Sequence, residues 1–247
     1  MASDFGLFSE FERKLRQLVP ASLSASRLLP DQFLISRDGT VSVYYAPMDA
    51  IEPNARIAIV GITPDRTTAG LALVTAHREL ADGQVAETAL AAAKTHASFS
   101  GFRKQLVAWL DYLEIPRLLG LRTSSQLWKS DRRLLHATSA IRYPVFVDSQ
   151  NYNGSKPPLA QHKAFRPYLF NTLAPELDRL PAALVIPLGR RVDEALETLV
   201  AAGRMDSARC LKGFPHPSGQ NGHKGRQWNE NREQLKSQTE AWLTRSR

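Results

Sequence analysis

Short apolar segments alternate with amphipathic segments along the chain, and this alternation predicts the fold class. The apolar runs at residues 56–61, 134–141 and 182–188 predict strands buried on both faces, as in a parallel sheet. Shorter runs at residues 40–45 and 209–211 predict two further strands. Apolar side chains at helical spacing predict helices up to about residue 19 and at residues 71–80, 87–94, 102–113, 167–180, 192–202 and 229–243. We therefore expect an α/β fold, a three-layer α/β/α sandwich around a central, mainly parallel, four-stranded sheet.

A length of 247 residues suits one large domain. We expect residues 1–247 to form a single domain, with residues 1–50 as an N-terminal helix and an extension packed on it. Ligands of a parallel sheet bind where loops leave the carboxyl ends of the strands. The informative loops are therefore residues 61–70, 139–154, 189–191 and 213–222, and all four contain Gly, Pro, Asn or charged residues.

The composition excludes several classes of protein. Cys210 is the single cysteine, which excludes a disulfide framework, a four-Cys zinc site and a four-Cys iron–sulfur cluster. We expect neither a metal nor a cofactor. No apolar run is long enough to cross a bilayer, and the N-terminus lacks the core of a signal peptide. The sequence thus predicts a cytoplasmic protein, a monomer, with no membrane partner.

The charge balance points to a polyanionic partner. Lys and Arg outnumber Asp and Glu by 32 to 24, which gives a net charge of +8. The basic residues cluster at residues 117–142 and again at residues 212–232. This excess favours DNA as the partner, with a merely solvated basic surface as the alternative.

Residues 212–229 (KGFPHPSGQNGHKGRQWN) are the most informative loop. Pro215 and Pro217 fix φ on both sides of His216, so its imidazole is held on a stiff support. Ser218 and the Gly and Asn residues after it free backbone N–H groups ahead of the closing helix, where anions are favoured. The pattern favours contact with a phosphate and a base together, and a rigid surface turn is the alternative.

Five segments, in order, resemble motifs of the uracil-DNA glycosylase superfamily. Residues 60–65 (VGITPD) are similar to its first active-site loop. Residues 98–101 (SFSG) and the helix after them are similar to a segment whose Phe stacks on the flipped base. Residues 138–144 look like the next strand and loop, residues 184–190 (LVIPLGR) like the next-to-last strand and turn, and residues 216–218 (HPS) like the closing motif.

The resemblance implies a DNA glycosylase, which flips a base out of DNA and hydrolyses its N-glycosidic bond to leave an abasic site. The reaction develops an anion on the base and a positive charge on the sugar. His216 is the candidate to stabilise the base anion, and Asp65 or Thr63 to position water. The chain departs from the family here, because the position of its Asp, Glu or Asn aligns with Ile62 or Thr63. Asp65 as a helix N-cap is the alternative to a catalytic role.

An extrahelical base needs an aromatic face and hydrogen bonds to its edge. Phe99 is the expected platform, with core packing as the alternative, and Ser139 stands where the family has Asn. The amides and the phenol of residues 148–154 are candidates for reading a base, with a polar turn as the alternative. The expected substrate-binding residues are Gly61, Ile62, Pro64, Phe99, Ser139, Tyr152 and Asn153. The expected DNA contacts are Arg66, Arg190, Lys212, Ser218, Asn221 and Lys224.

The departures from the family pattern leave the substrate open. Uracil is the default of the family, while smaller and more polar walls would admit a modified pyrimidine such as a hypermodified cytosine of phage DNA, which implies antiphage defence. Because no Lys is clearly placed as a nucleophile, we expect a monofunctional hydrolase. The main alternative is a non-catalytic DNA-binding protein that retains the fold, and a third is an unrelated phosphate-binding α/β hydrolase.

Overall fold

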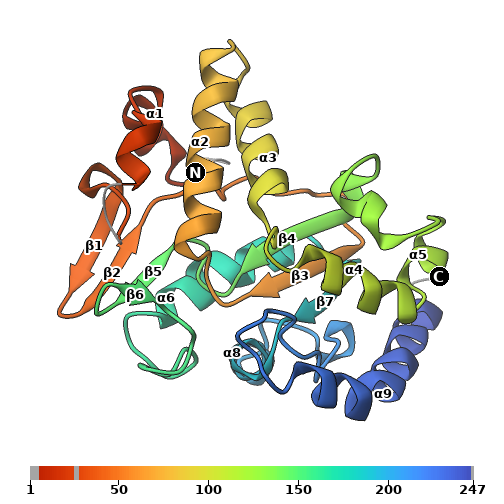
Figure 1. The fold of residues 1–247 in the computed structure, drawn as a ribbon. Coiled ribbons are helices and arrows are strands. Elements are labelled where there is room, and N and C mark those ends of the chain that lie inside the picture. Colours follow the sequence, from red (N-terminus) through yellow and green to blue (C-terminus); the bar gives the residue numbers. More distant parts are fainter. Residues whose placement is uncertain (1–5, 25–27, 246–247) are drawn as a thin grey trace.

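The computed structural model describes residues 6–24 and 28–245, shown in Figure 1. Phe5, part of the apolar spacing in the first predicted helix, lies outside the described residues. The strands are β1 (Leu34–Asp38), β2 (Val41–Tyr44), β3 (Ile57–Gly61), β4 (Leu135–Ser139), β5 (Val145–Val147), β6 (Gln150–Asn151) and β7 (Leu184–Pro187). The α-helices are α1 (Phe8–Arg16), α2 (Arg66–Ala81), α3 (Ala86–Ala97), α4 (Arg103–Tyr112), α5 (Ile115–Leu119), α6 (Arg166–Tyr168), α7 (Ala174–Asp178), α8 (Arg190–Ala201) and α9 (Lys224–Arg245). Short 3₁₀ turns lie at Pro20–Ser24, Asp31–Phe33, Ser124–Trp128, Arg132–Leu134 and Ser207–Arg209.

The parallel sheet has three strands in the order β4-β3-β7. The α/β class is thereby confirmed, whereas the predicted central sheet of four strands is wrong. The segment expected to form the fourth strand, residues 209–211, makes only an isolated parallel bridge between Cys210 and Val185. The segment stays beside β7, since the Leu211 N–H donates to Val185 and the Phe214 carbonyl accepts from Gly189, but Gly213, at φ +86°, interrupts the extended backbone between these bonds.

A second, antiparallel sheet of order β1-β2-β5-β6 lies beside the parallel one (Figure 1). Of its strands, the sequence predicted only β2. Both of its hairpins have two-residue turns, since Asp38 pairs with Val41 and Val147 pairs with Gln150. The second turn places Asp148 and Ser149 at φ +50° and +60°, the positive values that a type I′ turn requires. Part of the loop predicted at residues 139–154 is therefore a hairpin.

Each face of the parallel sheet packs against its own hydrophobic cluster. Successive side chains of a strand point to opposite faces, so Ile57 and Ile59 join the cluster that contains Trp109 of α4 and Trp228 of α9. The intervening residues of β3 join the larger cluster with α1, α2, α3 and α8. The sheet is thus covered by helices on both sides, and its strand ends are free to carry loops.

All the predicted helices are present, but several differ from the prediction in detail. Helix α9 begins at Lys224, five residues before residue 229, and the short helix α5 was not predicted. Helix α2 begins at Arg66, five residues earlier than residue 71, because Asp65 accepts the Thr68 N–H and caps the first turn. The helix predicted over residues 167–180 is interrupted by a π-helical turn at Leu169–Leu173, which joins α6 to α7. The N-terminal helix packs into the larger cluster, where the Phe11 ring stacks on Tyr45 at a centroid distance of 4.5 Å.

Candidate active site

A cavity of about 750 Å³ lies at the carboxyl ends of β3, β4 and β7, where ligands of a parallel sheet bind. It brings together residues that are far apart in the sequence. Thirteen of the predicted site residues line it: Gly61, Ile62, Thr63, Pro64, Asp65, Phe99, Ser139, Tyr152, Asn153, Arg190, His216, Ser218 and Asn221. Arg66, Lys212 and Lys224 do not.

His216 has a defined tautomer in this cavity. The backbone N–H of Ser218 donates to its Nδ1 at 3.3 Å, and the Ser218 hydroxyl lies 3.0 Å from the same nitrogen. Burial lowers the pKa of His216 to about 4, so the ring is neutral at neutral pH. Since a backbone N–H can only donate, Nδ1 is the acceptor and the proton lies on Nε2. No partner of Nε2 is found among the described residues, so this N–H is available to a ligand.

Two neighbours hold the His216 ring. The Phe102 ring packs against it edge-on at a centroid distance of 5.4 Å. On the backbone side, Gly189 follows β7 at φ +87° and ψ 162°, a region essentially restricted to glycine. A Cβ at this position would lie 3.0 Å from the His216 Cβ. The turn after β7 and the His loop therefore fit together only with glycine at residue 189.

Asp65 caps α2 and also lines the cavity. Its Oδ1 accepts the Thr68 N–H at 2.7 Å, so the N-cap assignment is correct. The side chain is exposed, and its other oxygen has no partner among the described residues. The cap occupies one oxygen and leaves the second available to a water molecule.

Thr63 is a weaker candidate than Asp65 for binding a water molecule, because its hydroxyl already has two partners in the protein. Its hydroxyl donates to the Tyr143 carbonyl at 2.8 Å and accepts the Val145 N–H at 3.1 Å. These bonds tie the loop after β3 to the start of β5 in the antiparallel sheet. Because the proton of Thr63 is already donated, a water molecule could use only the remaining lone pair.

Phe99 forms an aromatic wall next to the end of β3. Its backbone adopts φ +58°, an uncommon value for a non-glycine residue, directly after α3 ends. A Cβ on Gly61 would lie 3.4 Å from the Phe99 ring and 3.4 Å from the Ser139 hydroxyl. Glycine at the end of β3 thus lets the Phe99 ring approach the backbone closely, and Phe102 packs against the ring at a centroid distance of 5.7 Å.

The loop after β6 supplies two more cavity residues. Tyr152 is buried, its hydroxyl donates to the Pro157 carbonyl at 2.5 Å, and its ring packs on Phe165 at 4.8 Å. The phenol is thus used in shaping the loop. The Asn153 Oδ1 accepts the Ser155 N–H at 3.0 Å, which leaves its amide NH₂ for a ligand.

The predicted DNA contacts divide into two groups. Arg190, Ser218 and Asn221 line the cavity, where the Asn221 amide donates to the His216 carbonyl and braces the His loop. Arg66 instead donates through its guanidinium to the Leu23 carbonyl, so it fastens the N-terminal segment. Lys212 pairs with Glu197 at 3.3 Å and Lys224 donates to the Pro217 carbonyl at 3.2 Å, both outside the cavity.

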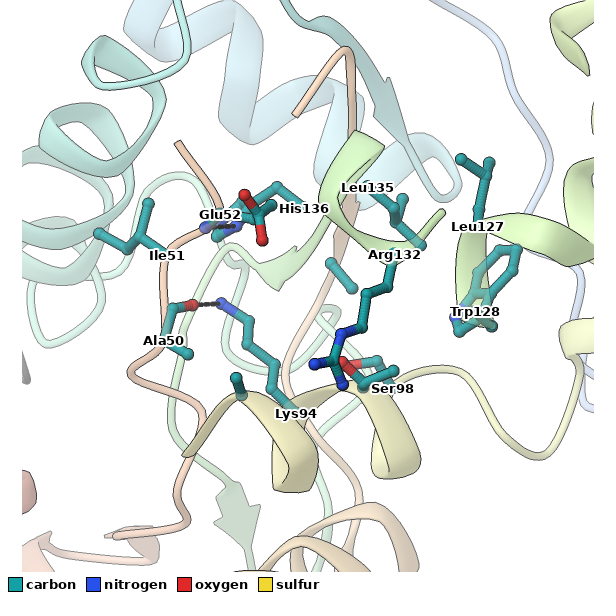
Figure 2. A pocket seen from close by; sticks show the side chains of 13 residues that line it. Ala50, Ile51, Glu52, Lys94, Ser98, Leu127, Trp128, Arg132, Leu135 and His136 are labelled. Atoms are coloured by element: carbon teal, nitrogen blue, oxygen red, sulfur yellow. Dashed lines mark hydrogen bonds between the residues drawn. The ribbon is translucent and has the colours of Figure 1, made fainter. Parts of the chain in front are cut away.

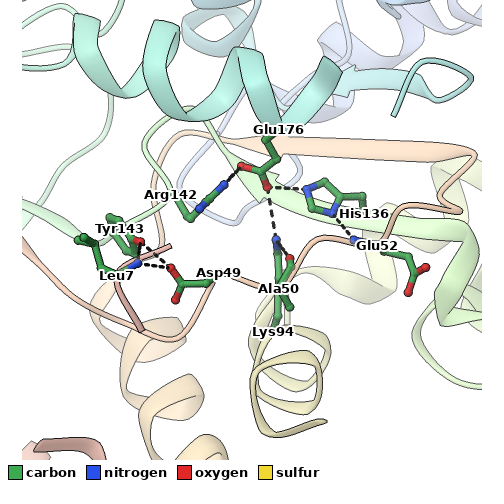
Figure 3. Close-up of polar contacts among 9 residues, drawn as sticks. All are labelled: Leu7, Asp49, Ala50, Glu52, Lys94, His136, Arg142, Tyr143 and Glu176. Atoms are coloured by element: carbon green, nitrogen blue, oxygen red, sulfur yellow. Dashed lines mark hydrogen bonds and ion pairs between the residues drawn. The ribbon is translucent and has the colours of Figure 1, made fainter. Parts of the chain in front are cut away.

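The sequence did not reveal a buried charge cluster beneath the cavity (Figure 3). Glu176 accepts from Arg142 at 2.7 and 3.2 Å, from His136 at 2.5 Å and from Lys94 at 3.5 Å. Its side chain is 0% exposed, and Lys94 and Arg142 also line the cavity. The sequence pattern of a helix does not distinguish a buried lysine from a surface lysine. The one available sequence signal was Glu176, a charged residue at a buried position of α7.

The cluster fixes the charge of each member. Burial lowers the pKa of Lys94 to about 8 and the pKa of His136 to about 4, so the imidazole is neutral. Its Nδ1 accepts the Glu52 N–H, and its Nε2–H donates to Glu176. Burial alone would raise the pKa of Glu176, but Arg142 and Lys94 lower it well below its usual range. Two cations therefore face one carboxylate under the cavity floor.

The described residues were also compared with the patterns of metal sites and of membrane-spanning helices. Within residues 6–24 and 28–245, no three His, Cys, Asp or Glu side chains are grouped so as to hold a metal ion. None of the helices in that part of the chain is long and apolar enough to cross a membrane.

Comparison with known proteins gives one relative. The chain is 37% identical over 232 residues to a protein of Bacillus subtilis (strain 168) named "Uncharacterized protein YoxB", and the match covers 93% of this chain and 90% of the relative. No protein-family model and no solved structure matches the chain.

Proposed function

The chain belongs to the same family as the Bacillus subtilis protein YoxB, and we propose that it is a monofunctional DNA glycosylase. Its substrate would be a base flipped out of DNA into the 750 Å³ cavity. The observation that carries this proposal is the neutral, partly buried His216, whose Nε2–H is free to donate into a cavity at the strand ends. The net charge of +8 supports DNA as the partner.

The proposed reaction uses few groups. The bond between C1′ and the base nitrogen breaks, the base leaves with the electron pair, and His216 donates a hydrogen bond to its carbonyl oxygen. The free oxygen of Asp65 orients a water molecule that adds to C1′. The negative charge of the Asp65 carboxylate also offsets the positive charge that develops on the sugar. The base takes up the proton that the water loses. Phe99 stacks on the base while this occurs.

The size of the cavity supports a modified pyrimidine as the substrate. Sites for drug-sized ligands span roughly 300–1,000 Å³, so a cavity of about 750 Å³ exceeds what a bare pyrimidine ring requires. Gly61 and Ser139 are small residues that line this cavity together with Phe99. We therefore place hypermodified cytosines of phage DNA beside uracil as candidate substrates, with antiphage defence as the role that they imply.

The test is base release from DNA. The purified protein is incubated with uracil-containing, mismatched and phage-modified DNA, abasic sites are cleaved with alkali, and the released base is identified by mass spectrometry. We expect release that is lost in His216→Ala and retained in His223→Ala, a matched control because His223 is exposed in the same loop. Absence of release from every DNA would overturn the proposal.

A second variant separates the two roles of Asp65. Asn is as good an N-cap as Asp, so Asp65→Asn keeps the bond to the Thr68 N–H and removes only the negative charge. We expect base release to fall by orders of magnitude while the thermal unfolding temperature changes little. Release at the wild-type rate would limit Asp65 to capping α2.

A non-catalytic DNA-binding protein is the second candidate, and the engagement of the Thr63 hydroxyl on both sides favours it. This residue or Ile62 aligns with the position that carries Asp, Glu or Asn in the glycosylases that the chain resembles. Tight binding of DNA without base release, unchanged in His216→Ala, would establish this candidate instead.

A further inference from the structure

A small pocket of about 70 Å³ adjoins the main cavity (Figure 2). It lies between α3, the start of β4 and the 3₁₀ turns at Ser124–Trp128 and Arg132–Leu134. A buried water needs roughly 10–15 Å³ on this measure, so the pocket has room for a few waters or for one carboxylate or phosphate group.

The polar groups that line this pocket are mainly donors. Trp128 is 8% exposed, and its Nε1–H has no hydrogen-bond partner among the described residues. The Lys94 amine uses one N–H on the Ala50 carbonyl at 2.6 Å and lies 3.5 Å from Glu176, which leaves a third N–H. Figure 2 shows Arg132 reaching toward α3, with no hydrogen bond from its guanidinium to another residue drawn.

Acceptors are scarce in the same lining. Glu52 is its one acidic residue, and both nitrogens of His136 are engaged, by the Glu52 N–H and by Glu176. A buried donor without a partner is destabilising by about 1–3 kcal/mol. The Trp128 N–H and the two cations are therefore complementary to an anion with several acceptor oxygens.

We propose that the small pocket is a second binding site, which takes an oxyanion such as a carboxylate or a phosphate group. Lys94, Ser98 and Ala137 line both this pocket and the main cavity, so the two spaces adjoin at these residues. The oxyanion has two possible sources: a substituent of the base held in the main cavity, or a free ion. The first source rests on the proposed glycosylase function, whereas the second is independent of it.

The first arm of the test measures binding alone. Inorganic phosphate is titrated into the ¹⁵N-labelled full-length protein, and the indole N–H resonances of its Trp residues are followed by NMR. We expect the Trp128 resonance to shift in a saturable way. Arg132→Gln should weaken this binding by about 10- to 100-fold, since a hydrogen bond to a charged group contributes ~1.5–3 kcal/mol. Arg133→Gln is the matched control, because Arg133 is exposed next to Arg132 and does not line the pocket.

The second arm identifies the source. Release of 5-carboxylcytosine and of 5-methylcytosine from DNA is compared in the wild type, Arg132→Gln and Arg133→Gln. A preference for the carboxylated base that only Arg132→Gln removes assigns the oxyanion to the substrate, and phosphate binding without such a preference assigns the site to a free ion. A Trp128 resonance that phosphate does not move overturns the second site. Absence of base release with phosphate binding intact overturns the glycosylase and leaves the second site standing.

Discussion

Glu176→Gln should destabilise the protein far more than its single lost charge suggests. The carboxylate is fully buried and accepts on both oxygens, from His136 and Lys94 on one and from Arg142 on the other. An amide in the same place presents an NH₂ group to one of these donors and leaves two cations without a counter-charge. Removal of one partner from a buried ion pair typically costs about 3–5 kcal/mol. For a protein of this size, that corresponds to a decrease in Tm of about 6–20 °C.

The control is Asp178→Asn, two residues further along α7. Asp178 pairs with Arg204 at 3.1 Å, but its side chain is 55% exposed, and surface pairs contribute about 0–1 kcal/mol. Urea unfolding followed by circular dichroism measures both variants. If Glu176→Gln costs less than Asp178→Asn, or both lie close to the wild type, the carboxylate is not what holds the cluster together.

The stability difference between the wild type and Glu176→Gln should also depend on pH. The pKa of Glu176 is lowered in the folded protein by Arg142 and Lys94 against the effect of burial, so the carboxylate stabilises the fold above its ordinary value of 4.5. As the pH falls below that value, the unfolded chain takes up a proton that folded Glu176 resists, and this contribution is lost. The stability difference between the wild type and Glu176→Gln should therefore be constant near neutral pH and shrink in acid. A difference that grows in acid contradicts this sign.

Three further predictions concern the cavity. His216 should remain neutral, with its proton on Nε2, from pH 7 down to about 5, because burial lowers its pKa to about 4; an NMR titration with a midpoint near 6.5 would contradict the buried position. Gly189→Ala should lower the free energy of unfolding by about 1–3 kcal/mol and abolish base release by displacing His216. Gly203→Ala is the control and should keep base release, because Gly203 also lies at positive φ (+68°) but has open space around it. Equal release from both variants would show that Gly189 does not position the His216 ring. Phe99→Leu should lower kcat/KM for base release roughly 5- to 150-fold, since base–aromatic stacking contributes about 1–3 kcal/mol; an unchanged value would assign Phe99 to core packing.

Strands β3 and β7 were predictable because each one is a continuous apolar run. Strand β4 contains His136, Thr138 and Ser139, and only the apolar residues among and around them indicated a strand. That regularity also located the cavity, since residues after Gly61, Ser139 and Leu188 had to meet at one edge of the sheet. The antiparallel sheet was missed because β5 and β6 contain only three and two residues, too few for a period to show. One local signal was present, however: the two-residue turn begins with Gly39, which lies at φ +55°, and glycine is favoured at the first central position of hairpin turns.

The cluster around Glu176 shows where local reasoning stops. Its members come from α3, β4, the loop after β4 and α7. Each partner of Glu176 lies at least 34 residues away from it in the sequence, so no short window contains Glu176 and one of its partners. Each looks like an ordinary polar residue in its own segment. Only the three-dimensional packing of α7 shows that the Glu176 carboxylate is buried and therefore requires cationic partners.

The π-helical turn at Leu169–Leu173 sets the rotational phase of that helix. Each residue of an α-helix advances about 100° around the axis, and a π turn inserts one residue more than a regular turn. Glu176 lies three residues beyond it and faces Arg142 because of this extra residue. A regular α-helical turn over the same residues would rotate Glu176 by about 100° away from Arg142. The charge beneath the cavity is therefore encoded by a count of residues as much as by their identity.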